Sequence, residues 1–99
     1  MKTINQDVDL SNLFFKALPE WLAEVRVNGS FDCDNNQLTS LEGSPKVVGG
    51  DFWCVNNQLT SLNGSPKEVG GDFCCYDNPG KFTKEDVRKV CNVKGRIYV

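Results

Sequence analysis

The residues of this chain with the greatest potential for chemistry are its cysteines, because thiolates bind metals and act as nucleophiles. Three of them, Cys33, Cys54 and Cys75, recur at intervals of 21 residues. Phased positions of this kind face the core of a repeat, where Cys packs as a small hydrophobic residue, and zinc would need four ligands that converge on one point. We therefore expect inert thiols, with no metal site and no cofactor.

Cys74 lies outside this phase, on the outward side of its predicted strand, and we expect it to be an accessible thiol. No basic neighbour in the sequence lowers its pKa. The chain has an odd number of cysteines, five, and its N-terminal segment contains no apolar signal region. These features predict reduced thiols and a cytoplasmic location.

Acidic and polar side chains offer a second possible chemistry. The chain contains no histidine, and so lacks the usual general base near neutral pH and the commonest metal ligand. The segment Asp32-x-Asp34-x-Asn36 resembles the opening of a calcium loop. Gln37 and Gly43, however, stand where such a loop needs Gly and Glu, so we expect no calcium site.

Asp51 and Asp72 occupy equivalent positions and would lie about 4.8 Å apart on neighbouring strands, close enough for paired acid–base chemistry. Each follows a Gly-Gly pair, and Gly-Gly-Asp is a turn signal that recurs with the unit. The sequence has no phosphate-binding glycine loop, nucleophile elbow or triad. We expect no catalytic residues and no enzymatic activity.

Length and charge limit the remaining possibilities. The chain has 99 residues, which is enough for one domain with a single modest core. Residues 1–80 carry five basic and eleven acidic side chains (−6), whereas residues 81–99 carry six basic and two acidic ones (+4). Nucleic-acid affinity depends on neutralising phosphates with basic side chains. The net negative charge of residues 1–80 therefore argues against direct nucleic-acid binding.

A 21-residue internal repeat dominates the chain. The segment Asn35-Asn36-Gln37-Leu38-Thr39-Ser40-Leu41 recurs as Asn56-Asn57-Gln58-Leu59-Thr60-Ser61-Leu62, and Gly-Ser-Pro-Lys follows both copies after one more residue. A third copy begins in the same phase and departs from the pattern after Asn78. A fixed period of this length is typical of stacked solenoid proteins.

Each unit reads Phe-x-Cys-x-x-Asn-x-Leu-x-x-Leu, the leucine-rich-repeat pattern with Phe and Cys in place of two leucines. Phe and Cys alternate with the strand period of two, so both should face the core while the residues between them face outward. Equivalent strands should form a parallel sheet. Asn36, Asn57 and Asn78 should stack as a buried ladder that satisfies backbone groups where each strand turns away.

These motifs resemble known families. The Asn-Asn-Gln-Leu-Thr-Ser-Leu stretches, with Leu18-Pro19-Glu20-Trp21-Leu22 before them, resemble the short leucine-rich repeats of bacterial effector proteins. The longer pattern Gly-Gly-Asp-Phe-x-Cys-x-x-Asn-Gln-Leu-Thr-Ser-Leu-x-Gly-Ser-Pro-Lys is more similar to small repeat proteins of tailed bacteriophages. The resemblance covers about residues 18–80 and implies a leucine-rich-repeat fold and a phage origin, without naming a target.

The ends of such an array need covering structures. Within residues 9–24, Leu13, Phe14, Ala17 and Leu18 predict an amphipathic helix that Asp9 or Ser11 would cap. At the other end, Thr83 to Asp86 resembles a capping box that opens a second helix. The apolar face of that helix would comprise Phe82, Val87, Val90 and Cys91, and Ile97-Tyr98-Val99 reads as a final strand.

The resulting fold prediction is a single α/β domain over residues 1–99. We expect a short leucine-rich-repeat-like solenoid with a small parallel sheet, an N-terminal helical cap and a C-terminal helix–strand cap. The N-terminal cap would span residues 1–26, the repeats 27–80 and the C-terminal cap 81–99.

The outward strand positions are the predicted binding site, because packing fixes the buried positions and leaves the exposed ones free to vary. An exposed Trp beside Val and Tyr is costly unless a partner covers it, and Trp and Tyr are common interface hot spots. The alternative is that cap residues cover this face. The candidate partner-binding residues are Asp32, Asp34, Trp53, Val55, Cys74 and Tyr76.

The functional prediction is a non-enzymatic protein–protein interaction module that binds, and inhibits, a host protein in the host cytoplasm. One alternative is a structural or regulatory subunit that self-associates through the sheet or its edge strand. Another is an acidic inhibitor that mimics nucleic acid through its aspartates. We expect no membrane association.

Overall fold

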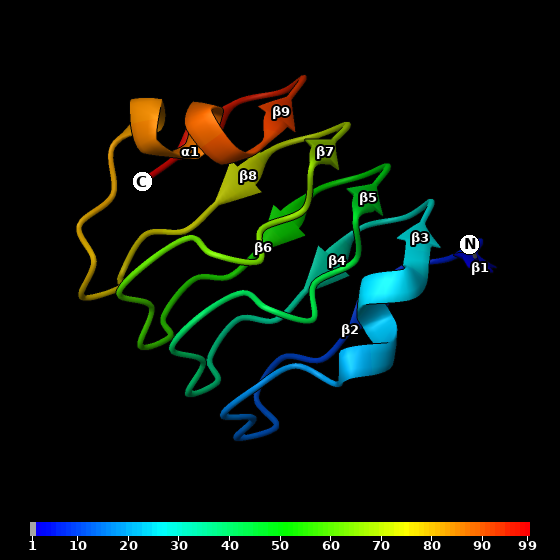
Figure 1. The fold of residues 1–99 in the computed structure, drawn as a ribbon, viewed down its shortest axis with the longest axis horizontal. Coiled ribbons are helices and arrows are strands. Elements are labelled where there is room, and N and C mark those ends of the chain that lie inside the picture. Colours follow the sequence, from blue (N-terminus) through cyan, green and yellow to red (C-terminus); the bar gives the residue numbers. More distant parts are fainter. Residues whose placement is uncertain (1) are drawn as a thin grey trace.

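The computed structural model describes residues 2–99 and has an α/β fold with small parallel strands in two sheets and little helix (Figure 1). The first sheet has the order β1-β3-β5-β7-β9 and the second the order β10-β8-β6-β4-β2. The strands of the first sheet are β1 (Lys2–Ile4), β3 (Val25–Val27), β5 (Val47–Val48), β7 (Glu68–Val69) and β9 (Asn92–Val93). Those of the second sheet are β2 (Val8–Asp9), β4 (Phe31–Asp32), β6 (Phe52–Trp53), β8 (Phe73–Cys74) and β10 (Ile97–Tyr98).

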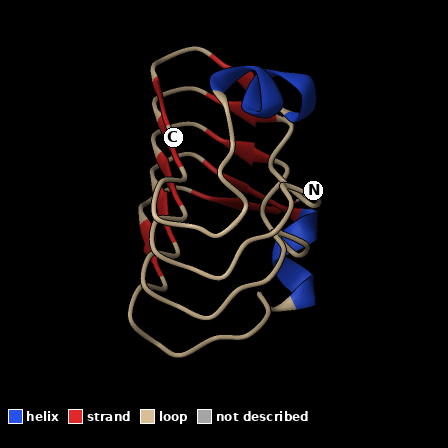
Figure 2. Ribbon diagram, turned by 90° about the vertical axis from the view of Figure 1, so that its left-hand side faces the viewer, coloured by secondary structure: helices blue, strands red, loops and turns tan. Residues whose placement is uncertain are grey.

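The chain alternates between the two sheets, and we call each stretch that contributes one strand to each sheet a unit. Unit 1 contains β1 and β2, and unit 5 contains β9 and β10. Figure 2 shows the strands of successive units in two stacks, one along the left edge and one across the upper middle, with loops closing the units below them. In the middle units the parallel register pairs Phe31 with Phe52 and Phe52 with Phe73, which confirms the 21-residue phase.

The core lies inside these stacked units and is built from the phased apolar residues. The Phe31 and Phe52 rings stack with centroids 5.9 Å apart, and the Phe52 and Phe73 centroids are 5.0 Å apart. Each is fully buried, which stabilises the fold by roughly 1.5–3 kcal/mol per side chain. The other side chains without measurable exposure are Val27, Cys33, Leu38, Leu41, Val48, Cys54, Leu59, Val69 and Val87.

The buried asparagine ladder predicted from the repeat is confirmed. The side-chain amide of Asn57 donates to the carbonyls of Cys33 and Cys54 at 3.0 and 3.3 Å, and its oxygen accepts from the Leu38 amide at 3.1 Å. Asn78 donates in the same way to the Cys54 and Cys75 carbonyls. Each asparagine therefore joins its own unit to the unit before it.

Unit 1 differs from the sequence prediction, because the helix expected within residues 9–24 does not form as predicted. Asn12 and Phe14 have φ values of 59° and 61°, in the left-handed region, which interrupts a right-handed helix. The Val8 and Leu10 amides instead donate to unit 2 carbonyls, so the open edge of β4 captures this segment as a strand. A 3-10 helix, η1 (Glu20–Glu24), is the helical element that follows.

The C-terminal helix is confirmed at α1 (Lys84–Val90), where Thr83 and Asp86 form both halves of a capping box. The Asp86 amide donates to the Thr83 hydroxyl at 3.1 Å, and the Thr83 amide donates to the Asp86 carboxylate at 2.9 Å. Val87 is buried in the core. The predicted final strand corresponds to β10. The single sheet that was predicted is wrong, because the chain forms two sheets, and none of the strands of the first sheet, β9 among them, was predicted.

The ladder leads to a first prediction. We expect Asn57→Ala to lower the free energy of unfolding by about 1–3 kcal/mol, because three buried backbone carbonyls and one amide lose their partner. Chemical denaturation checks this, with Asn63→Ala as the control, since Asn63 is exposed and lies in the same unit. Equal stability of the two variants would contradict a structural role for the ladder.

Candidate functional site

The outer side of the second sheet carries a continuous row of side chains, which we call the outer row. Strand register places one residue of each strand in it, and their order across the sheet is Asp9, Asp32, Trp53, Cys74 and Tyr98. A second row, two residues further along each strand, comprises Asp34, Val55 and Tyr76. Strand alternation turns both rows away from the buried phenylalanines.

Four of the six predicted binding residues reach the surface of this face. Asp32, Asp34 and Trp53 are partly exposed, and Tyr76 is 41% exposed. The predicted exposure of Cys74 and Val55 is wrong, because their exposed fractions are only 1% and 9%.

Both exceptions have large neighbours. Cys74 lies between Trp53 on β6 and Tyr98 on β10, and both of these side chains are larger than the thiol. Val55 follows β6 at the level between Asp34 and Tyr76. Cys74 is thus flanked by one residue of the repeats, Trp53, and one of the predicted C-terminal cap, Tyr98.

Two residues of the outer row, Asp9 and Tyr98, were missed by the sequence analysis. The 21-residue shift does not find them, because the offset is 23 residues from Asp9 to Asp32 and 24 from Cys74 to Tyr98. A detectable signal was present in Val8-Asp9-Leu10-Ser11-Asn12, which matches Phe31-Asp32-Cys33-Asp34-Asn35 in pattern. Asn12 and Asn35 also share a left-handed backbone, with φ values of 59° and 57°.

The charge of this face changes along the stack of units. Asp9, Asp32 and Asp34 make the end at units 1 and 2 acidic. Aromatic side chains follow at Trp53 and Tyr76, and the last unit contributes Tyr98. The face therefore presents an acidic end followed by aromatic residues, while Arg96 lies at the sheet corner in the position that Asp51 and Asp72 hold in the units before it.

Another row of polar residues, at the corner between the two sheets, serves the fold. Asp51 Oδ1 accepts from the Asp72 amide at 2.8 Å, and Asp72 Oδ1 accepts from the Arg96 amide at 2.8 Å. Asp7 Oδ1 does the same for the Ser30 amide. The two aspartates considered for acid–base chemistry thus each bind a backbone amide of the next unit.

Asp34 is the acid on the sheet face with the most altered environment. Its Oδ1 accepts from the Val55 amide at 2.6 Å, and its own amide donates to Asp32 Oδ1 at 2.9 Å. Burial, with smaller contributions from the negative charges of Asp32 and Asp9, raises the pKa of Asp34 to about 6 against the lowering effect of the Val55 hydrogen bond. The acidic end of the face therefore gains charge as the pH rises through about 6.

The raised pKa of Asp34 predicts a pH-dependent stability. Between its ordinary value of 3.8 and about 6, the folded protein holds a proton that the unfolded chain releases, so the free energy of unfolding falls as pH rises. Asp34→Asn keeps an oxygen acceptor for the Val55 amide but carries no charge. At pH 7 its free energy of unfolding should exceed that of the wild type by about 1 kcal/mol, a value reduced from the full effect of the pKa shift because Asp34 is partly exposed. The two should converge at pH 4.

Thermal melts across this pH range measure the difference, and Glu42→Gln, at an exposed acid away from the face, is the charge-matched control. If the melting temperatures of Asp34→Asn and the wild type changed in parallel with pH, the raised pKa of Asp34 would not be the cause of the pH-dependent stability.

All five cysteines are free and buried. The prediction that the Cys74 thiol is accessible is therefore wrong. Burial raises the pKa of Cys74 to about 12 and that of Cys75 and Cys91 to about 11. It raises the pKa of Cys33 and Cys54 well above the ordinary thiol value. Among residues 2–99 there is no group of three or more His, Cys, Asp or Glu side chains placed to hold a metal ion.

This burial predicts slow reaction with thiol reagents at pH 8. We expect less than one equivalent of label in the native protein and five after denaturation, because a protonated, enclosed thiol is a poor nucleophile. Thr60→Cys, at an exposed position, is the positive control and should react at once. Rapid labelling of Cys74 with an unchanged circular dichroism spectrum would contradict its burial.

Comparison of the chain with protein-family models, with curated proteins and with solved structures finds no match. Within residues 2–99, no helix has the length and apolar character needed to cross a membrane.

Proposed function

We propose that this chain is a leucine-rich-repeat-type solenoid that binds another protein through the outer face of its second sheet and catalyses no reaction. Support for the solenoid comes from five units in parallel register, the first four of which are joined by a ladder of buried asparagines. Caps at the two ends belong to this proposal, with η1 and unit 1 at one end and α1 with β10 at the other. Solenoids of this kind use extended faces as binding surfaces.

The observation that carries the proposal is the position of Trp53. It is partly exposed in the middle of the outer row, between Asp32 on β4 and Cys74 on β8. The neighbouring Tyr76 is also exposed. Tyr and Trp side chains supply large contact areas at low entropic cost, and they dominate the energetics of many interfaces.

The acidic end of the face extends this proposal to the partner. A basic patch on the bound protein would meet Asp9, Asp32 and Asp34 in one orientation, since complementary charge steers association and fixes register. The resemblance to small bacteriophage proteins supports a host protein as the partner, inhibition as the consequence and the host cytoplasm as the location.

A second candidate function is nucleic-acid mimicry, which the cluster of Asp9, Asp32 and Asp34 at the acidic end favours. Rows of carboxylates can occupy a site that otherwise binds phosphates. Complex formation by such a mimic should weaken steeply with salt, whereas binding centred on Trp53 should weaken little.

The test is affinity capture from host lysate followed by mass spectrometry and a binding titration of the captured protein. We expect Trp53→Ala to weaken binding by about 2 kcal/mol or more, the usual cost of truncating a hot spot, while the melting temperature changes by a few degrees. Tyr76→Ala should act alike with a smaller loss. Asp32→Ala should mainly change the association rate.

Trp21→Ala is the matched control, because Trp21 is 62% exposed and lies on η1 beside the first sheet. Binding should be the same for this variant and the wild type. The proposal fails if both tryptophan variants bind like the wild type, or if the loss in Trp53→Ala only follows its unfolded fraction.

A further inference from the structure

Acidic and aromatic side chains are direct neighbours on the outer face of the second sheet. Strand register sets Asp32 of β4 beside Trp53 of β6, and adjacent strands lie about 4.8 Å apart. Neither of the two rows on this face contains a lysine or an arginine. The carboxylates and aromatic rings of the face therefore have no cation from their own rows.

The second row places the same two kinds of side chain around Val55. The Val55 carbonyl accepts from the Asn35 amide at 3.0 Å. The Tyr76 carbonyl accepts from the Asn56 amide at 3.2 Å, so the pairing of units continues past the ends of the strands. Asp34 and Tyr76 therefore lie on the two sides of Val55.

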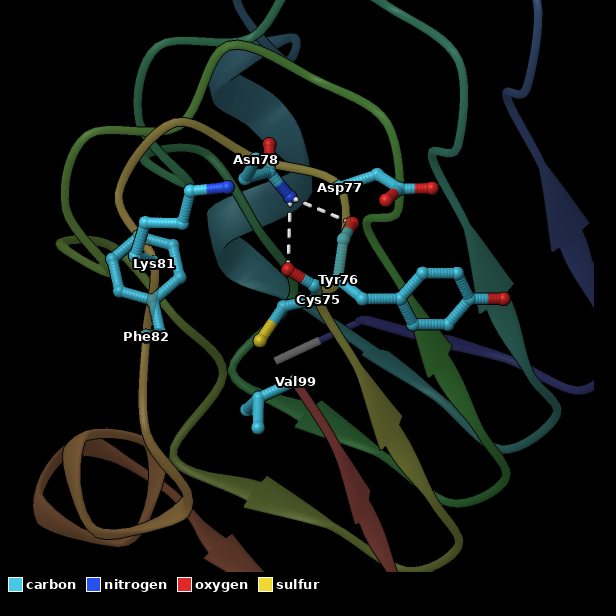
Figure 3. Close-up of a pocket in the computed structure, with 7 residues that line it drawn as sticks. All are labelled: Cys75, Tyr76, Asp77, Asn78, Lys81, Phe82 and Val99. Atoms are coloured by element: carbon cyan, nitrogen blue, oxygen red, sulfur yellow. Dashed lines mark hydrogen bonds between the residues drawn. The ribbon is translucent and has the colours of Figure 1, made fainter.

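Trp53 completes this group, because it precedes Val55 by two residues and faces the same side. We call Asp34, Trp53, Val55 and Tyr76 the Val55 cluster: one carboxylate and two rings around a short apolar side chain. Tyr76 is 41% exposed, whereas Val55 is 9% exposed. Figure 3 shows the Tyr76 ring directed away from Lys81, the next cation along the chain. The cluster is thus accessible to a cation from another molecule.

Asp34 has free capacity for such a cation. Its Oδ1 accepts from the Val55 amide at 2.6 Å, and Asp32 Oδ1 accepts from the Asp34 amide at 2.9 Å. Within residues 2–99, no donor forms a hydrogen bond with Oδ2 of either carboxylate. A partly buried carboxylate without a cation is costly to ionise, and its raised pKa of about 6 reflects this cost. A cation at Oδ2 would offset it.

We propose, on the basis of the binding function proposed for this face, that the Val55 cluster receives an arginine side chain of the partner protein. The guanidinium would lie against the rings of Trp53 and Tyr76 and donate to Oδ2 of Asp34. A guanidinium is planar and weakly hydrated, stacks on aromatic rings and pairs with carboxylates through two N–H groups. The ammonium of lysine is a strongly hydrated point charge and fits this combination less well.

Arginine binding at Asp34 should depend on pH. The guanidinium favours the carboxylate, so binding releases the proton that Asp34 holds below about pH 6, and affinity should rise from pH 5 to pH 7. The titratable groups around Asp34 are two acids and three thiols: Asp9, Asp32, Cys33, Cys54 and Cys74. The thiols do not titrate in this range, because burial raises their pKa values far above it.

The experiment titrates the ¹⁵N-labelled full chain with the peptide acetyl-Gly-Ser-Arg-Ser-Gly-amide and follows chemical shifts by NMR. The chain has two tryptophans, so the indole N–H of Trp53 reports on the cluster and that of Trp21 is an exposed internal control. We expect the Trp53 indole and the Val55 and Tyr76 amides to shift, and Trp21 to stay unchanged. The same peptide with citrulline, the neutral isostere of arginine, should bind about tenfold more weakly, and the lysine peptide about threefold more weakly.

Two variants and a matched control locate the arginine. Asp34→Asn keeps the acceptor for the Val55 amide, and it should weaken binding of the arginine peptide about tenfold and abolish the pH dependence. Trp53→Leu should weaken binding about fivefold, because the cation loses one ring. Glu42→Gln, with the same change in charge at an exposed acid away from the face, should bind like the wild type. Thermal melts at pH 7 verify that all three are folded.

Three results would overturn the proposal: no shift of the Trp53 indole at tens of millimolar peptide, binding of the citrulline or lysine peptide as tight as that of the arginine peptide, or equal binding by Asp34→Asn and the wild type. The titration needs no partner protein, so each result can occur while Trp53→Ala still weakens binding of the captured partner. Conversely, peptide binding at Trp53 together with an unaffected partner would support the arginine site and contradict the proposed function.

Discussion

Strands of only two or three residues cannot satisfy the backbone of a 21-residue unit, and the buried asparagines meet this constraint. Asn36, Asn57 and Asn78 are the polar side chains that enter the interior where β4, β6 and β8 end. Each binds carbonyls of two successive units, so it ties the units together while allowing the chain to leave the sheet. Because an unpaired buried carbonyl is costly, this ladder fixes the height and register of neighbouring units.

That register determines what the surface can display. Strand alternation sends Phe and Cys inward in units 2 to 4 and leaves the residues between them outward. The outward positions are therefore free to differ, and they do so in order along the stack, from Asp9 and Asp32 through Trp53 to Tyr98. The register that the asparagine ladder fixes thus gives an interior that repeats and an outer row whose residues change from unit to unit.

The two ends of the stack are unequal. Gln6 stands at the corner position where units 2 to 5 have glycine. At the other end α1 contacts β10, and the cations Lys84, Arg88 and Arg96 line a depression beside that strand. Charged side chains along the edge of a sheet discourage its pairing with another strand.

The sequence by itself determined the interior, because each of its signals is local or strictly periodic: the 21-residue phase, the Asn57 ladder, the buried Cys33 row and the Thr83 capping box. Only the tertiary structure decided the fate of segments that match the repeat loosely. Residues 8–12 carry a strand pattern directly before the apolar helical stripe of Leu13, Phe14, Ala17 and Leu18, and the edge of β4 favoured the strand. Likewise Cys74 and Val55 point outward as their phase predicts, yet they are buried, because exposure depends on the size of neighbours on adjacent strands that a single strand's pattern does not contain.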